Sequence, residues 1–105
     1  MDEKVQDLIQ RGIEAMGLEQ FQIALEQFER ARALDPRNIE IYLHVGNARM
    51  ALEQTDKAIE SFRRALLLDE NNVQALYSMA CAYFVADDPA NAIRFFNRSE
   101  ERRVG

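Results

Sequence analysis

The chain has 105 residues, of which 48% are hydrophobic and 30% are charged, a balance typical of a globular domain rather than a disordered chain. Its net charge of −5 disfavours nucleic acid as a partner, because proteins that bind nucleic acids usually carry a basic surface. Cys81 is the single cysteine, which excludes an internal disulfide, and the first residues lack the apolar stretch of a secretory signal. We therefore expect one domain over residues 1–105, a cytoplasmic location and no contact with a membrane.

Apolar residues at helical spacing predict six helices. Leu8, Gly12 and Ala15 recur at i, i+4 and i+7, which places them on one face of a helix, and the segment from Ala24 to Ala31 repeats the pattern. The predicted helices span residues 3–16, 20–34, 39–51, 55–68, 73–86 and 89–102. The sequence therefore predicts an all-α fold.

Polar, turn-forming segments separate these helices. The segments MGLEQ (16–20) and MALEQ (50–54) differ in one letter and predict the same bend within two successive helix pairs. The third bend, FVADDP (84–89), offers an Asp that can accept hydrogen bonds from free N–H groups and a Pro suited to the first helical turn. The segments DPRN (35–38) and DENN (69–72) then separate one pair from the next.

The sequence matches itself when it is shifted by 34 residues, and aligned positions form columns of similar residues. The clearest columns are Gly12, Gly46 and Ala80; Ala24, Ala58 and Ala92; Leu25, Ile59 and Ile93; Phe28, Phe62 and Phe96; and Ala31, Ala65 and Ser99. Small residues let paired helices approach closely, and the Phe column fills the space beside them. We expect three repeats, 5–38, 39–72 and 73–105, which must stack because no single pair can bury its apolar face.

With this period, its Gly and Ala columns, its Phe column and Pro36 closing the first repeat, the chain resembles a tetratricopeptide repeat protein. The resemblance implies a right-handed superhelix of three antiparallel helix-turn-helix repeats, an α-solenoid, with the first helices lining a concave face. Members of this family usually hold a peptide or a partner helix on that face and catalyse nothing. The sequence departs from the family pattern at Glu70, which replaces the closing Pro of the second repeat.

A second stripe follows the stacking stripe of each first helix, one residue further along, and we expect it to line the binding groove. The predicted binding residues are Ile9, Ile13, Met16, Leu43, Asn47, Met50, Tyr77, Cys81 and Phe84, bordered by His44 and Ser78. The sequence leaves open whether Ile9, Ile13 and Leu43 face this groove or are buried between adjacent first helices.

The large side chains of Met50, Tyr77 and Phe84 favour the groove, since they offer more apolar surface than stacking needs, and methionine adapts its shape. Asn47 is the best candidate for a hydrogen bond to a ligand backbone. His44, the only histidine, is expected to be a surface or groove-edge residue, and without further His or Cys ligands no metal site is predicted.

One family specialisation can be excluded from the residues. Members that bind chaperone tails ending in EEVD use Lys, Arg and Asn on their first helices, and the matching positions here carry Ile9, Ile13, His44, Gln74 and Ser78. A terminal carboxylate would find no cationic partner among them. The sequence also lacks a nucleophile–base motif or a phosphate-binding glycine loop, so we expect neither an enzyme nor a cofactor.

The last helix retains Ile93, Phe95 and Phe96 beside a polar end of the chain. If two of them stay exposed they form a patch that predicts self-association, a docking partner, or a chain that is part of a longer protein. The leading hypothesis is a scaffold that binds a protein segment in its groove. The alternatives are a homo-oligomer that stacks end to end through residues 93–96, and a chaperone for a secreted hydrophobic partner.

Overall fold

The computed structural model describes residues 3–104, which form six α-helices and no strand within that range. The helices are α1 (Glu3–Gly17), α2 (Phe21–Leu34), α3 (Ile39–Ala51), α4 (Thr55–Leu68), α5 (Val73–Val85) and α6 (Pro89–Val104). Each end lies within two residues of the predicted one, so the all-α prediction is confirmed. Within residues 3–104 no helix is both long enough and apolar enough to cross a membrane.

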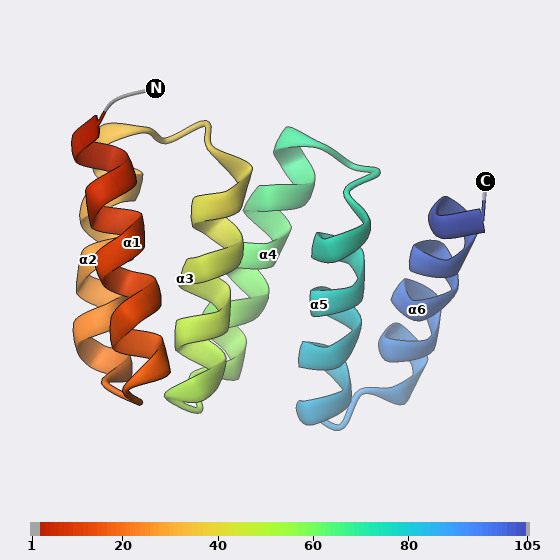
Figure 1. The fold of residues 1–105 in the computed structure, drawn as a ribbon. Helices are drawn as coiled ribbons and strands as arrows, with labels where there is room; N and C mark the ends of the chain where they lie inside the picture. The colour runs from red at the N-terminus through yellow and green to blue at the C-terminus, as the bar shows by residue number, and fades with distance from the viewer. Residues whose placement is uncertain (1–2, 105) are drawn as a thin grey trace.

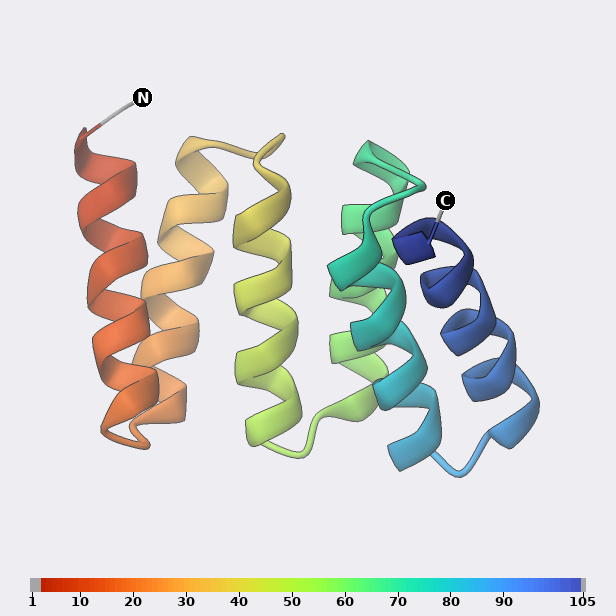
Figure 2. The same ribbon diagram turned by 45° about the vertical axis from the view of Figure 1, so that its right-hand side comes forward.

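The helices form three antiparallel pairs that stack side by side (Figure 1). In Figure 1 the first helices α1 and α3 lie in front of their partners α2 and α4, and Figure 2 shows how α6 packs against α5 at the C-terminal end of the stack. Each second helix also packs against the first helix of the next pair, α2 on α3 and α4 on α5. This two-layer stack is the solenoid that the repeat predicted.

The glycine column lets an aromatic ring lie directly against a helix backbone. A β-carbon on Gly46 would lie 2.7 Å from Cδ1 of Phe62, and one on Gly12 would lie 2.7 Å from Cδ1 of Phe28. Both rings are fully buried. The prediction that small residues admit the Phe column is therefore confirmed in the first two repeats.

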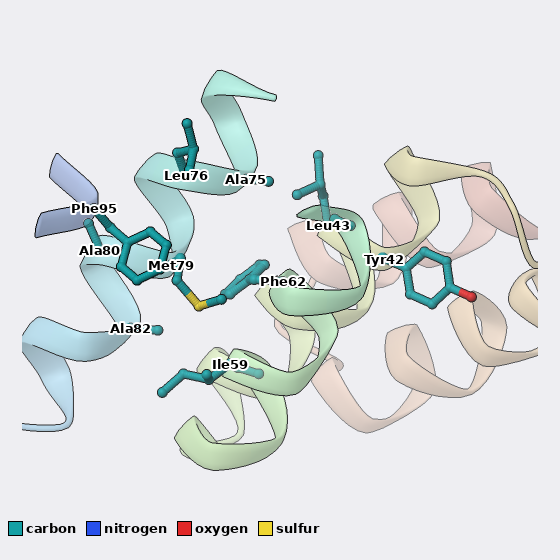
Figure 3. Close-up of a cluster of buried hydrophobic side chains, with 12 residues drawn as sticks. Tyr42, Leu43, Ile59, Phe62, Ala75, Leu76, Met79, Ala80, Ala82 and Phe95 are labelled. Carbon is teal, nitrogen blue, oxygen red and sulfur yellow. The ribbon is translucent and has the colours of Figure 1, made fainter. Parts of the chain in front are cut away.

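The core consists of two clusters that lie between neighbouring pairs, rather than one central cluster. One set of buried side chains joins the first and second repeats, and another joins the second and third. Figure 3 shows the second set, in which Phe62 of α4 and Met79 of α5 point toward each other. Leu76 and Phe95 complete it from the third repeat. Stacking thus buries apolar faces that no isolated pair could bury.

The three bends within pairs share one backbone geometry. Glu19, Glu53 and Asp87 have φ values of 59°, 61° and 60°, the left-handed region that non-glycine residues rarely adopt. In each bend the following N–H donates back to a carbonyl five residues earlier, as from Gln54 to Arg49 at 2.8 Å. The near-identity of MGLEQ and MALEQ thus encodes a repeated helix-ending motif.

Side-chain caps begin the helices that follow polar segments. Asn38 and Asn72 each accept a hydrogen bond from a backbone N–H in the first turn of α3 and α5, at 3.1 and 2.9 Å. Asp88 accepts one at the start of α6 at 3.3 Å, as the sequence predicted. The loop before α3 is also tied to that helix, because the Tyr42 hydroxyl donates to the Pro36 carbonyl at 2.7 Å.

Candidate functional site

The predicted binding stripe runs along the first helices α1, α3 and α5, but its members differ in accessibility. Ile13, Asn47, Tyr77 and Phe84 are exposed. Met16, His44, Met50, Ser78 and Cys81 are partly buried. The exposed members are thus three large apolar side chains and one amide. Ile13 lies on α1, Asn47 on α3, and both Tyr77 and Phe84 on α5.

Ile9 and Leu43 are buried, which corrects their assignment to an open groove. Ile9 belongs to the core between the first and second repeats, and Leu43 belongs to the core between the second and third. The physical reason is stacking, because the next repeat covers this position. Of the three positions that the sequence left open, only Ile13 faces solvent.

His44 is fixed by two neighbours and borders the stripe. Its ring stacks on Phe28 of α2 with centroids 4.8 Å apart and an interplanar angle of 11°. Its Nε2 atom lies 3.3 Å from a carboxylate oxygen of Glu40, one turn earlier in α3. Over residues 3–104 no three His, Cys, Asp or Glu side chains come together as a metal site would require.

Phe95 is buried against α5, which corrects its assignment to an exposed contact patch. Its ring stacks on Tyr83 with centroids 5.6 Å apart. The guanidinium groups of Arg94 and Arg98 cover the ring, 5.2 and 5.1 Å from its centroid. Phe95 therefore stabilises the third pair and is not free to bind a partner.

The other two members of that patch remain accessible. Ile93 is exposed, and Phe96 is partly buried with its ring edge-on to Tyr77 at 5.5 Å between centroids. Its counterpart Phe62 is covered by Met79 of α5, whereas no helix within residues 3–104 covers Phe96 in the same way. The position of the third repeat in the stack therefore accounts for the greater exposure of Phe96.

Sequence reasoning missed a polar cavity of about 210 Å³ between α2, α3 and α4. Its lining residues are Glu29, Arg32, Tyr42, Val45, Arg49, Lys57, Glu60, Ser61 and Arg64. Arg49 and Ser61 stand where the third repeat has Tyr83 and Phe95, so a stacked aromatic pair is replaced by an arginine and a small side chain. That exchange between aligned positions is the signal that could have located the cavity.

Glu29 connects two repeats across this cavity. One carboxylate oxygen lies 2.6 Å from Nε of Arg32, and the other lies 3.0 Å from Nη2 of Arg49 on α3. Arg49 also donates to the side chain of Gln54 at 2.8 Å. Burial raises the pKa of Glu29, but its hydrogen bonds and ion pairs with Arg32 and Arg49 outweigh burial and hold the pKa below its ordinary value of 4.5.

Comparison with protein families gives one match. Residues 46–84 fit the family model described as TPR repeat, the tetratricopeptide repeat. No curated protein matches the sequence. The matched segment covers the end of α3, the second bend, all of α4 and nearly all of α5.

Several solved structures share the whole fold. SycD, the type III secretion translocator chaperone of Yersinia enterocolitica, in a structure described as an alternative dimer, has a TM-score of 0.94 at 18% identity, covering 100% of this chain and 80% of that one. SycD in complex with a peptide of the translocator YopD has a TM-score of 0.91 at 19% identity, covering 97% of this chain and 78% of that one.

MamA of AMB-1 has a TM-score of 0.86 at 23% identity, covering 96% of this chain and 55% of that one. The chain thus spans a little over half the length of MamA. At identities this low the likeness establishes a shared fold.

Proposed function

We propose that this chain, which has the fold of SycD and MamA and matches the TPR repeat model over residues 46–84, is a non-catalytic scaffold that binds a peptide or helix of another protein along α1, α3 and α5. The observation that carries this proposal is a strip of exposed side chains on these helices, the apolar Ile13 on α1, the polar Asn47 on α3, and the apolar Tyr77 and Phe84 on α5. Exposed apolar side chains aligned along one face of a stack are typical of an interaction surface.

The chemistry of the strip indicates the kind of ligand it accepts. Met16 and Met50, both partly buried, can adjust their shape to apolar side chains of a ligand. Asn47 offers donors and an acceptor to a ligand backbone at the centre of the strip. No Lys or Arg stands at the predicted binding positions, so a ligand held by its terminal carboxylate does not fit.

The complex of SycD with a peptide of the translocator YopD supports this proposal, because SycD is a protein of the same fold that binds a peptide. A chaperone for a hydrophobic partner is therefore one form of the proposed activity. The proposal includes a cytoplasmic location, no cofactor, and neither nucleic acid nor a membrane as partner. The net charge of −5 supports the exclusion of nucleic acid.

The test uses peptides selected for binding from a random 12-residue library, with dissociation constants measured by fluorescence anisotropy. Ile13→Glu should weaken the selected peptides by about tenfold or more, because it places a charge in the apolar strip. Ile23→Glu is the matched control, since Ile23 is 48% exposed against 41% for Ile13 but lies on the second helix of the same pair. Equal effects of the two substitutions, or none from Ile13→Glu, would refute the proposal.

A further inference from the structure

The polar cavity between α2, α3 and α4 carries an excess of positive charge. Its charged lining residues are the cations Arg32, Arg49, Lys57 and Arg64 and the carboxylates Glu29 and Glu60. The cations outnumber the carboxylates by two, although the whole chain has a net charge of −5. A hollow lined mainly by one sign of charge raises the local concentration of the opposite sign. The cavity is therefore a place where this acidic protein attracts an anion.

Glu29 does not neutralise its side of the cavity, because two arginines share its single charge. Its two carboxylate oxygens accept hydrogen bonds from Nε of Arg32 at 2.6 Å and from Nη2 of Arg49 at 3.0 Å. The ion pair also holds both guanidinium groups in place before any ligand arrives. Side chains fixed in this way lose little conformational freedom on binding.

The side of the cavity formed by α4 has the same imbalance. Glu60 lies 2.7 Å from Nη1 of Arg63, which is not part of the lining, and 3.7 Å from Nε of Arg64. Lys57, one turn before, forms an ion pair with no carboxylate within residues 3–104. The ammonium group of Lys57 and most donors of Arg64 are therefore available to a ligand.

The space for a ligand comes from a difference between the second and third repeats. In the third repeat Tyr83 and Phe95 stack with their ring centroids 5.6 Å apart. The aligned positions of the second repeat carry Arg49 and Ser61, so two rings are exchanged for a guanidinium group and a small hydroxyl side chain. Ser61 is 7% exposed and lines the cavity. The exchange thus opens a volume and lines it with hydrogen-bond donors.

The cavity and the proposed binding strip lie on opposite sides of α3. Tyr42, Val45 and Arg49 line the cavity, whereas Asn47 is exposed on the strip. Asn47 precedes Arg49 by two residues, about 200° around a helix with 3.6 residues per turn. The remaining walls come from the second helices α2 and α4. A ligand in the cavity therefore does not compete with one on the strip.

We propose that the cavity between α2, α3 and α4 binds a phosphate group. A phosphate monoester carries a charge of about −1.5 to −2 at pH 7 and three acceptor oxygens, which match the two excess positive charges better than a single carboxylate does. Arginines bind phosphate oxygens through paired N–H groups. The donors surround the group from three helices and come from Arg32 on α2, Arg49 on α3, and Lys57 and Arg64 on α4.

The phosphate group belongs either to the free ion or to a phosphorylated side chain of another protein. The net charge of −5 disfavours a nucleic acid as its source. Both sources share the same chemistry at the cavity. They differ in whether contacts outside the cavity add to the affinity, which a comparison of inorganic phosphate with a phosphoserine peptide measures.

The test is a titration of isotope-labelled protein with inorganic phosphate at neutral pH, followed through backbone amide NMR shifts. Sodium chloride at the same ionic strength is the reference. The amides of Arg49 and Ser61 should shift in a saturable way with phosphate alone. Lys57→Gln combined with Arg64→Gln should weaken phosphate binding by about tenfold or more. Both side chains are exposed, so the fold should persist, which circular dichroism checks.

The matched control is Arg30→Gln combined with Arg37→Gln. It removes the same two positive charges from exposed arginines that do not line the cavity, and it should leave phosphate affinity nearly unchanged. Ile13→Glu should also have no effect, so the strip and the cavity are tested independently. A phosphoserine peptide that binds more tightly than inorganic phosphate indicates a phosphorylated protein, and one that binds equally or more weakly indicates the free ion.

Three results would overturn the proposal. The first is a set of amide shifts that does not saturate or that chloride reproduces. The second is equal weakening by the two double variants, since the protein would then attract phosphate only through its overall charge. The third is equal affinity for succinate, a dianion of two carboxylates, because the cavity would then not distinguish phosphate from other anions.

Discussion

Gly46→Ala should destabilise the protein, although alanine is the better helix former. Gly46 lies in α3, where alanine would gain about 1 kcal/mol from helix propensity. The new methyl group, however, would overlap three atoms of the fully buried Phe62 ring, including Cδ1 at 2.7 Å. Overpacking of this kind costs about 1–3 kcal/mol, and a clash with a buried ring falls in the upper part of that range. We expect a net loss of about 1–2 kcal/mol.

Urea denaturation followed by circular dichroism measures this loss, and the melting temperature should fall by about 4–8 °C for each kcal/mol. Gly17→Ala is the control, since Gly17 is also helical and no atom lies within 4 Å of an added β-carbon. That control should gain about 0.4–1 kcal/mol. A Gly46→Ala protein as stable as the unaltered one would show that the ring is not packed against this helix.

A double-mutant cycle identifies the ring as the cause. Phe62→Leu alone should be destabilising, because it leaves a cavity in the core between α4 and α5. Adding Gly46→Ala to Phe62→Leu should then cost little, since leucine lacks Cε1 and Cζ, two of the three ring atoms that the methyl group meets. The expected interaction energy is about 1–2 kcal/mol. Strict additivity of the two changes would contradict the reasoning.

Three further predictions use the same denaturation assay. Glu53→Gly should stabilise the protein by about 0.5–1 kcal/mol, because Glu53 has a φ of 61° and glycine relieves the cost of that conformation. Glu29→Gln should cost about 1 kcal/mol by removing the link to Arg49. Because the pKa of Glu29 is lowered on folding, its contribution is present above its ordinary pKa of 4.5 and is lost as the pH falls through the folded value, so the two proteins should converge in stability in acid. Phe95→Ala should cost about 3–5 kcal/mol and Ile93→Ala less than about 0.5 kcal/mol, because only Phe95 is buried.

Each of these has a contrary outcome. A loss of stability in Glu53→Gly would mean that the glutamate side chain contributes more than the backbone strain costs. A constant difference between Glu29→Gln and the unaltered protein from neutral pH into acid would refute the assigned ion pair. A larger cost for Ile93→Ala than for Phe95→Ala would reverse the assignment of which side chain faces solvent.

The helices were predictable from the sequence because their signals are local and repeated. Apolar spacing, polar segments and the Phe column recur three times, so each helix end is supported by its counterparts. The bends were predictable as bends, but not their geometry. A glutamate at position 53 does not indicate a left-handed backbone, since helix ends of this kind usually carry glycine at the left-handed position.

Exposure along the binding stripe was less predictable, because it depends on position in the stack rather than on the residue. Ile9, Leu43 and Tyr77 occupy one column, yet the first two are buried and the third is exposed. The following repeat makes the difference, because α3 covers Ile9 and α5 covers Leu43, whereas no helix within residues 3–104 covers Tyr77. Phe95 was misassigned for a related reason, because its burial depends on Tyr83, a departure from the pattern of the other repeats.

The two ends of the stack differ in the side chains that they expose. At the N-terminal end α1 carries charged, exposed side chains at the positions that α3 and α5 use for stacking. At the C-terminal end Ile93 keeps the apolar character of its column while its neighbours further along α6 become charged. The same repeat chemistry that assembles the stack therefore gives its two ends different surfaces, with charged side chains exposed along α1 and the apolar side chains of Tyr77 and Ile93 exposed on α5 and α6.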